Sequence, residues 1–208
     1  MENIKCLFFD VGSTLVDECK AYESRMRSIA EAANVSYETV YETALRFYKQ
    51  NKKGDLETIK KLKVEMPKWR SECEVLYPDA EECLKRLSRK YKIGVIANQS
   101  LGTEKRLERF GILRYIDPVI ASAEEGVAKP DERIFEIALK RAKCSPEQAV
   151  MIGDRIDNDI VPAKKLGMRT VWVKQGFGKY WNITGEGERA DYEVNHLSEL
   201  LPIFIPPL

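Results

Sequence analysis

The sequence predicts an α/β fold with a parallel β-sheet, interrupted after its first strand by an all-helical segment. Two patterns support this prediction. From residue 77 onward, short apolar runs alternate with helical patterns, and such alternation is typical of a parallel sheet with right-handed crossovers. Residues 18–73, by contrast, have apolar positions at helical spacing and no convincing strand. The helical segment is therefore a candidate second module.

The first predicted strand ends at a carboxylate. An apolar, aromatic-rich run at residues 4–9 indicates a buried strand, and Asp10 follows it directly. In open α/β sheets the end of a strand is where the chemistry is found, and a carboxylate there can be a nucleophile or a metal ligand. Gly12, Ser13 and Thr14 come next, and such a loop can turn backbone N–H groups toward an anion. Asp is also a common turn residue, so this loop alone leaves a purely structural role open.

The helical segment reads as three helices. The first is predicted to end at Asn34, and Ser36 is a suitable N-cap for the second. Asp55 follows the break at Gly54 and is predicted to cap the third helix. Pro67 then interrupts the pattern or restarts it.

The rest of the chain supplies the sheet. Strands are predicted at residues 93–97, 117–121, 149–152 and 170–173, and helices at 80–90, 103–110, 132–142 and through 160–166. The stretches 122–130 and 176–188 are predicted to be loops, the second of them exposed. Pro202, Pro206 and Pro207 indicate a C-terminal tail.

Composition excludes several classes of function. Of the 208 residues 44% are hydrophobic, and 34 Lys and Arg nearly balance 33 Asp and Glu, so charge gives no argument for a nucleic-acid or membrane partner. The single histidine, His196, lies near the C-terminus and is expected at a helix start or on the surface, which removes most histidine-based mechanisms. The five cysteines are odd in number and lack paired metal-ligand spacing, which favours free thiols in a reducing compartment. With no signal peptide and no long apolar run, we expect a cytoplasmic protein.

Polar residues follow three of the predicted strands. Asp10, Asn98 and Asp154 each stand at a strand end, and Lys129 lies in the loop after a fourth strand. Because the carboxyl ends of parallel strands share one edge of the sheet, these side chains are expected to converge. Two carboxylates suit a hard cation such as Mg²⁺ with few protein ligands and several waters. A lysine beside them would hold a phosphoryl oxygen and offset repulsion between the substrate and the nucleophile.

Four segments in this order resemble the motifs of the haloacid dehalogenase-like hydrolases. They are Phe-Phe-Asp-Val-Gly-Ser-Thr-Leu at 8–15, Ile-Ala-Asn at 96–98, Lys-Pro-Asp-Glu-Arg-Ile-Phe at 129–135 and Ile-Gly-Asp-Arg-Ile-Asp-Asn-Asp at 152–159. The resemblance covers nearly the whole chain. It implies a Rossmann-like core with helices on both faces (residues 1–16 and 77–208), a mobile helical cap (17–76), and Mg²⁺-dependent hydrolysis through an aspartyl intermediate. It also implies a small-molecule substrate, without naming one.

The resemblance also implies roles for individual residues. Asp10 would be the nucleophile, and Lys129 would bind both the phosphoryl group and the Asp10 carboxylate. The metal ligands would be Asp10, Asp154 and the backbone carbonyl of Gly12. Ser13, Thr14 and Asn98 would help Lys129 to bind the substrate, and Asn158 and Asp159 would support the metal or orient its waters and Lys129.

Two positions depart from the pattern of the family's phosphatases. Those enzymes usually have a second Asp two residues after the nucleophile, which moves a proton, and this chain has Gly12 there. General acid–base help is worth roughly 10²–10⁴ in rate, so slow turnover of poor leaving groups is expected unless another acid, such as Asp17, replaces it. Ala97 stands where the second motif usually has a hydroxyl.

These departures leave three hypotheses. The first is a Mg²⁺-dependent phosphatase acting on a small phosphorylated metabolite. The second is a haloacid dehalogenase-type enzyme, since the superfamily's dehalogenases also lack the second Asp, although the metal-favouring Asp154 argues against it. The third is a catalytically degenerate binding or regulatory protein. Neither the substrate nor the oligomeric state can be inferred from the sequence.

Overall fold

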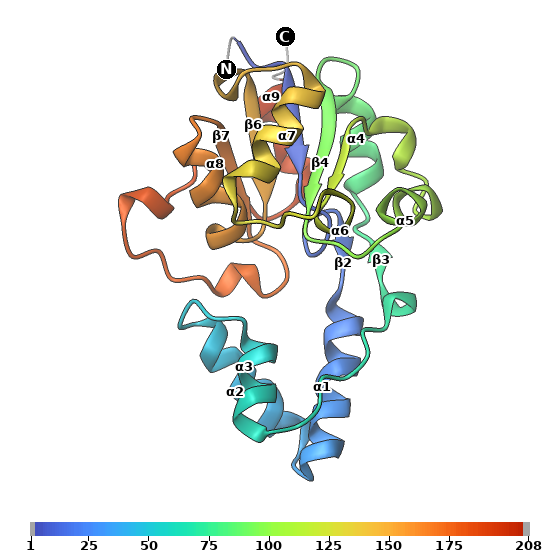
Figure 1. Ribbon diagram of the computed structural model, residues 1–208, viewed down its shortest axis with the longest axis vertical. Coiled ribbons are helices and arrows are strands. Elements are labelled where there is room, and N and C mark those ends of the chain that lie inside the picture. Colours follow the sequence, from blue (N-terminus) through green and yellow to red (C-terminus); the bar gives the residue numbers. More distant parts are fainter. Residues whose placement is uncertain (1–2, 206–208) are drawn as a thin grey trace.

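The computed structural model describes residues 3–205 and contains a six-stranded parallel sheet (Figure 1). Its strand order is β5-β4-β1-β6-β7-β8. The strands are β1 (Cys6–Phe9), β4 (Lys92–Ala97), β5 (Val119–Ala121), β6 (Ala149–Gly153), β7 (Arg169–Val173) and β8 (Tyr192–Val194). The chain order runs outward in both directions from β1, so the crevice at its end is a topological switch point, where open α/β sheets bind ligands. The predicted parallel α/β fold is confirmed.

Helices cover both faces of the sheet. They are α4 (Ala80–Leu87), α5 (Thr103–Arg109), α6 (Ser122–Glu125), α7 (Glu132–Ala142), α8 (Val161–Lys165) and α9 (Leu200–Phe204). Alternate residues of β1 enter opposite cores because successive strand side chains point to opposite faces. Leu7 and Phe9 pack in the core of α4, α5 and α9, whereas Cys6 and Phe8 pack in the core of α7 and α8. Every side chain of β1 is thus buried, which explains its unbroken apolar sequence.

Three helices, which we call the helical insertion, lie between β1 and β4 in the chain and apart from the sheet (Figure 1). They are α1 (Cys19–Ala33), α2 (Tyr37–Tyr48) and α3 (Gly54–Leu62), and they share an apolar core of their own. Two short antiparallel strands, β2 (Val16–Asp17) and β3 (Val75–Leu76), connect the insertion to the rest of the chain. As predicted, α1 ends at Asn34 and the side chain of Ser36 caps α2.

Several local predictions were wrong. Asp55 does not cap α3: it lies inside its first turn, where it pairs with Arg25 and accepts a hydrogen bond from the Tyr48 hydroxyl. Residues 64–70, around Pro67, have no regular structure. The predicted loop at 122–130 begins with α6, and the short strands β2, β3 and β8 were not predicted. Pro202 belongs to α9 rather than to a tail, whereas Pro206 and Pro207 lie outside the described residues.

The stretch 176–188 is less exposed than predicted, because it contacts the helical insertion. Phe177 stacks on Tyr48 with ring centroids 4.3 Å apart and meets Tyr22 edge to face at 5.1 Å. Asn51 and Asn182 exchange two hydrogen bonds of 2.8 and 2.7 Å. The insertion is therefore held against the core at this segment as well as at its two connecting strands.

Candidate active site

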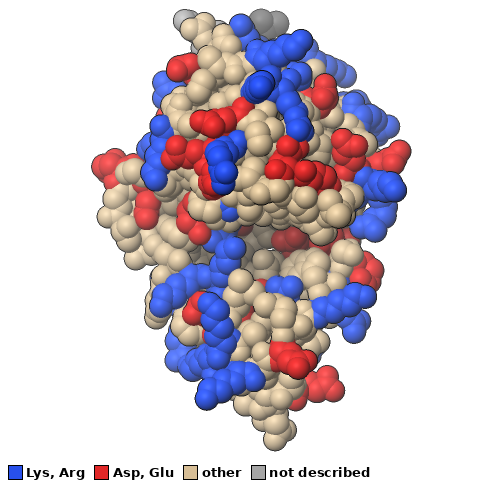
Figure 2. Space-filling model, viewed as in Figure 1, with Lys and Arg blue, Asp and Glu red and all other residues tan. Residues whose placement is uncertain are grey.

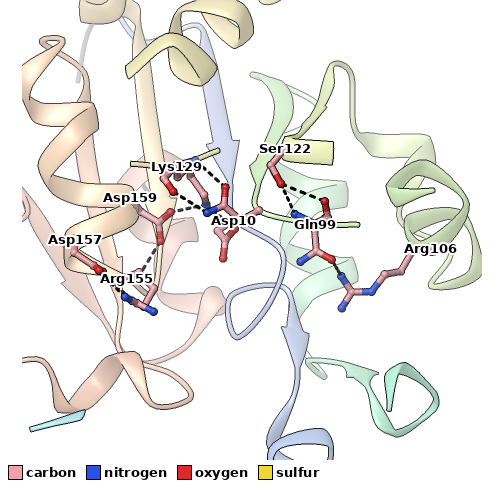
Figure 3. A network of polar contacts seen from close by, with 9 residues as sticks. Asp10, Gln99, Arg106, Ser122, Lys129, Arg155, Asp157 and Asp159 are labelled. Atoms are coloured by element: carbon pink, nitrogen blue, oxygen red, sulfur yellow. Dashed lines mark hydrogen bonds and ion pairs between the residues drawn. The ribbon is translucent and has the colours of Figure 1, made fainter. Parts of the chain in front are cut away.

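The polar residues predicted at the strand ends converge at one edge of the sheet, where Figure 3 shows Asp10 next to Lys129. Asp10, Asn98, Lys129 and Asp154 line a single cleft of about 870 Å³, which is visible as the hollow between the two parts of the molecule in Figure 2. The cleft is also lined by Gly12, Ser13, Asn158 and Asp159. Thr14 is not among its lining residues: it is fully buried, and its hydroxyl has no partner within the described chain.

Lys129 is a buried cation held between two carboxylates. Its Nζ lies 2.6 Å from Oδ1 of Asp10 and 2.6 Å from Oδ1 of Asp159, and its side chain is only 2% exposed (Figure 3). Burial alone would lower the pKa of Lys129, but the charges of Asp10 and Asp159 outweigh it and raise the pKa. Lys129 is therefore charged at neutral pH and fixes the position of the Asp10 carboxylate.

Asn98 holds the backbone from which Lys129 projects. Its side-chain amide donates to the Lys129 carbonyl at 2.8 Å, and its Oδ1 accepts from the Lys129 backbone N–H at 2.7 Å. Both groups of the amide are thus used by the main chain of the neighbouring loop. This double contact ties the end of β4 to the Lys129 loop, a link that sequence spacing did not reveal.

Asp159 reaches Lys129 through a π-helical turn, Ile156–Ile160, that follows β6. Its second carboxylate oxygen accepts from the backbone N–H of Arg155 at 3.0 Å. A Cβ at Gly153 would lie 2.3 Å from that same oxygen, so only glycine permits this close approach. Burial, followed by the charge of Asp10, raises the pKa of Asp159, and Lys129 opposes the shift.

Asp154 lies at the end of β6 with a buried carboxyl group, 4% of the residue being exposed. Burial, then the charges of Asp10 and Asp159, raises its pKa well above the usual value. Arg155 pairs with Asp157 instead, and within residues 3–205 no ion pair forms to Asp154. A buried carboxylate without a cation is costly, so this position favours an added positive charge.

The donor set fits a hard divalent cation. Ligand oxygens of Asp10, Asp154 and Asp159 all lie within 4.8 Å of one another. Because Asp159 already holds Lys129 and the N–H of Arg155, Asp10 and Asp154 are the carboxylates best placed for an ion. Carboxylate oxygens are the ligands that Mg²⁺ prefers.

Glu18, which the sequence did not identify, forms part of the cleft wall beside Asp10. Its Oε2 accepts from the Ser13 hydroxyl at 3.2 Å, and its Oε1 lies 3.6 Å from Arg106. Burial raises the pKa of Glu18 to about 7; Arg106 opposes the shift, and the charges of Asp10 and Glu74 add to it. Asp17, which the sequence offered as a replacement acid, is not among the residues that line the cleft. Its carboxylate accepts from the backbone N–H of Cys19 at the start of α1.

The helical insertion and α5 complete the cleft with aromatic and basic groups. Arg25 of α1 lies over the ring of Trp69, and both line the cleft. Arg106 pairs with Glu74 at 2.8 Å and also donates to Gln99. The other α5 cations at the cleft, Lys105 and Arg109, are exposed.

Within residues 3–205, no helix is long and apolar enough to cross a membrane.

Comparison of the chain with known proteins identifies a family, a relative and two structures that it is similar to. The sequence pattern described as haloacid dehalogenase-like hydrolase matches residues 4–167. The chain is 33% identical to a glyceraldehyde 3-phosphate phosphatase of Pyrococcus furiosus, over 98% of this chain and 94% of the relative. A structure of a HAD phosphatase from Thermococcus onnurineus superposes with a TM-score of 0.68 at 24% identity, covering 98% of this chain and 99% of the other. A 2-haloacid dehalogenase from Pseudomonas syringae gives 0.62 at 22% identity, covering 96% and 97%. At 22–24% identity, the likeness to these two structures shows the shared fold alone.

Proposed function

The chain belongs to the haloacid dehalogenase-like hydrolases and is an enzyme of that family, and from this premise we propose that it is a Mg²⁺-dependent phosphatase. The proposed reaction hydrolyses a small phosphorylated metabolite through an intermediate in which Asp10 carries the phosphoryl group. The observation that carries the proposal is the contact of 2.6 Å between Lys129 and Asp10 within a cleft lined by buried carboxylates. It pairs a fixed nucleophile with a cation that attracts phosphoryl oxygens.

In the proposed first step, a carboxylate oxygen of Asp10 attacks the phosphorus and the bond to the leaving oxygen breaks. Lys129 keeps Asp10 in position and contributes positive charge beside the phosphoryl oxygens. Asp159 and Asn98 orient Lys129 through its Nζ and its backbone. In the second step, water attacks the phosphorus, phosphate leaves and the Asp10 carboxylate is restored. Each step is easier than direct displacement by water.

Mg²⁺ would be held by Asp10, Asp154 and the backbone carbonyl of Gly12. When bound, the ion supplies positive charge to the phosphoryl oxygens and reduces their repulsion from Asp10. Ser13 remains a predicted substrate contact, as does Asn98, and Asn158 remains a predicted support for the metal; all three line the cleft. Thr14 is the weakest of these predictions, since its side chain is fully buried outside the lining.

The helical insertion is the proposed cap, and its position over the cleft favours a small substrate. Tyr22, Arg25 and Trp69 face the same space as Asp10, so a bound metabolite would contact both parts of the molecule. The relative from Pyrococcus furiosus is named for a triose phosphate. By this likeness we propose small phosphorylated metabolites, with triose phosphates among the first to test.

The test is hydrolysis of an aryl phosphate with Mg²⁺, with EDTA, and with the variant Asp10→Asn. We expect turnover that EDTA abolishes and that Asp10→Asn reduces to background. Asp117→Asn is a suitable control, because this side chain is 87% exposed and precedes β5. Equal activity in Asp10→Asn and in the parent would refute the proposed nucleophile. Release of halide from a 2-haloacid without metal would instead support the dehalogenase alternative.

A further inference from the structure

The space beside Gly12 is filled by the carboxyl group of another residue. A Cβ built on Gly12 would lie 2.5 Å from Oε1, 2.7 Å from Oε2 and 2.8 Å from Cδ of Glu18. Real side chains do not approach so closely, so Gly12 and Glu18 fit as a pair. The φ of Gly12 lies outside the left-handed region that favours glycine. The backbone would therefore accept an aspartate at this position, but the Glu18 carboxyl now fills the space and would have to move aside.

The position of Glu18 is set by its neighbours in the chain and across the cleft. It stands between β2 and α1, where the chain leaves the core and enters the helical insertion. Its side chain is 12% exposed and contacts the Ser13 hydroxyl in the loop that follows Asp10. Glu18 lines the same cleft as Asp10.

A purely structural role accounts poorly for this placement. Arg106 is the available basic partner of Glu18, at 3.6 Å, but it already pairs with Glu74 at 2.8 Å. Glu74 has a side chain only 2% exposed and also accepts from Trp69. The charge of Arg106 is therefore met without Glu18. A second carboxyl, pressed against Gly12 and open to the cleft, needs another explanation.

We propose that Glu18 is the general acid and base of this enzyme, replacing the aspartate that the family's phosphatases usually have at position 12. The inference rests on the proposed phosphatase function. In the first step, Asp10 bonds to phosphorus, the bond from phosphorus to the leaving oxygen breaks, and the Glu18 carboxylic acid gives its proton to that oxygen. In the second, the Glu18 carboxylate takes a proton from water as the water oxygen bonds to phosphorus, the bond to Asp10 breaks, and phosphate is released.

The proposal changes the expected substrate preference. Without an acid, an alkyl phosphate would be hydrolysed far more slowly than an aryl phosphate, because an alkoxide is a poor leaving group. With Glu18 as the acid, the parent protein hydrolyses alkyl phosphates as well. The dependence on the leaving group should then appear only when Glu18 is changed.

The experiment compares p-nitrophenyl phosphate with glycerol phosphate in Mg²⁺. In Glu18→Gln, the rate constant of the first step should fall by roughly 10²–10⁴ for the alkyl phosphate but by less than about tenfold for the aryl phosphate. The second step is the same for both substrates, so its rate constant should fall equally for the two. Retained burst release of nitrophenol also reports that the variant is folded. The control Glu82→Gln changes an exposed carboxyl of α4 and should leave both rates unchanged.

A carboxyl transplant gives the second test. The double variant Gly12→Asp with Glu18→Ala opens the space and places a carboxyl on residue 12, and it should recover at least about tenfold of the alkyl activity lost in Glu18→Ala. Gly12→Asp alone should not gain activity over the parent, because the new side chain displaces the Glu18 carboxyl from its place. Equal losses of the first-step rate constant for the two substrates in Glu18→Gln would overturn the role of Glu18, and so would no recovery in the double variant. Absence of any turnover in the parent would instead refute the proposed function, and the inference with it.

Discussion

Replacing Lys129 by methionine tests whether the buried carboxylates at the cleft depend on a single cation. Methionine keeps most of the length of the side chain and removes the charge that lies 2.6 Å from both Asp10 and Asp159. Removing one partner of a buried ion pair costs about 3–5 kcal/mol, because it leaves uncompensated buried charge. For a chain of this size, that loss lowers the Tm by roughly 6–20 °C at neutral pH.

The loss of stability in Lys129→Met should be smaller at lower pH. Burial raises the pKa of Asp154 and Asp159, and removing Lys129 removes a charge that holds the pKa of Asp159 down. The folded variant therefore binds more protons than the unfolded chain, so its stability increases as the pH falls. The deficit relative to the parent protein should shrink between about pH 7 and about pH 5.

The assay is thermal unfolding in EDTA at both pH values, with Lys140→Met as the control because Lys140 is an exposed residue of α7. The control should unfold within about 2 °C of the parent at either pH, since surface substitutions change stability little. The reasoning would be refuted if Lys129→Met unfolded at the same temperature as the parent, or if its deficit were the same at both pH values.

Three further predictions concern the metal, the helical insertion and the exposed cations of α5 at the cleft. Asp154→Asn should raise the Tm in EDTA, because it removes a buried charge without a partner, and should remove most of the stabilisation by Mg²⁺; thermal unfolding with and without MgCl₂ checks both, and an intact Mg²⁺ response would contradict the proposed ligand. Phe177→Ala removes the stacked contact with Tyr48, the edge-to-face contact with Tyr22 and a tilted contact with Tyr41, and such aromatic pairs are each worth about 0.5–1.5 kcal/mol beyond burial. Urea unfolding should therefore give a loss of at least about 1.5 kcal/mol, and proteolysis within residues 64–70 should be faster, whereas unchanged cleavage would argue against docking of the insertion by Phe177. Lys105→Gln with Arg109→Gln should lower kcat/KM and weaken its salt dependence while kcat stays the same, and an unaltered salt dependence would count against attraction of the substrate by these exposed cations.

The core of the site could be predicted from the sequence because it depends on strand ends. Asp10, Asn98 and Asp154 follow strands of one parallel sheet, and the geometry of such a sheet brings their ends to one edge whatever their separation in sequence. The unbroken apolar runs of β1 and β6 identify these strands, since both faces of the sheet are covered. Lys129 was predicted from its loop, and the resemblance of residues 152–159 to a family motif assigned Asp159 a role in orienting it. The π-helical turn that brings Asp159 to Lys129 has no periodic pattern of its own in the sequence.

The missed features depend on short elements or on contacts across the chain. Two-residue strands such as β2 and β3 are too short for a periodic pattern. Pro202 was interpreted as a tail residue, although it lies in the first turn of α9, where proline costs little. Glu18 precedes an amphipathic helix, so its sequence context indicates only a helix start. Its approach to Gly12 arises from the fold of the loop between β1 and β2, and no local pattern of residues encodes that approach.

The central claim is that Asp10 becomes covalently phosphorylated during turnover, and mass spectrometry of the rapidly quenched enzyme tests it most directly. The parent protein is mixed with an excess of aryl phosphate and Mg²⁺, quenched in acid within the first turnovers, and digested. We predict that the peptide containing Asp10 gains one phosphoryl group, and that the gain is absent with EDTA or in Asp10→Asn. Release of phosphate with no phosphorylated peptide at any quench time would contradict the account, because the water would then attack the substrate directly.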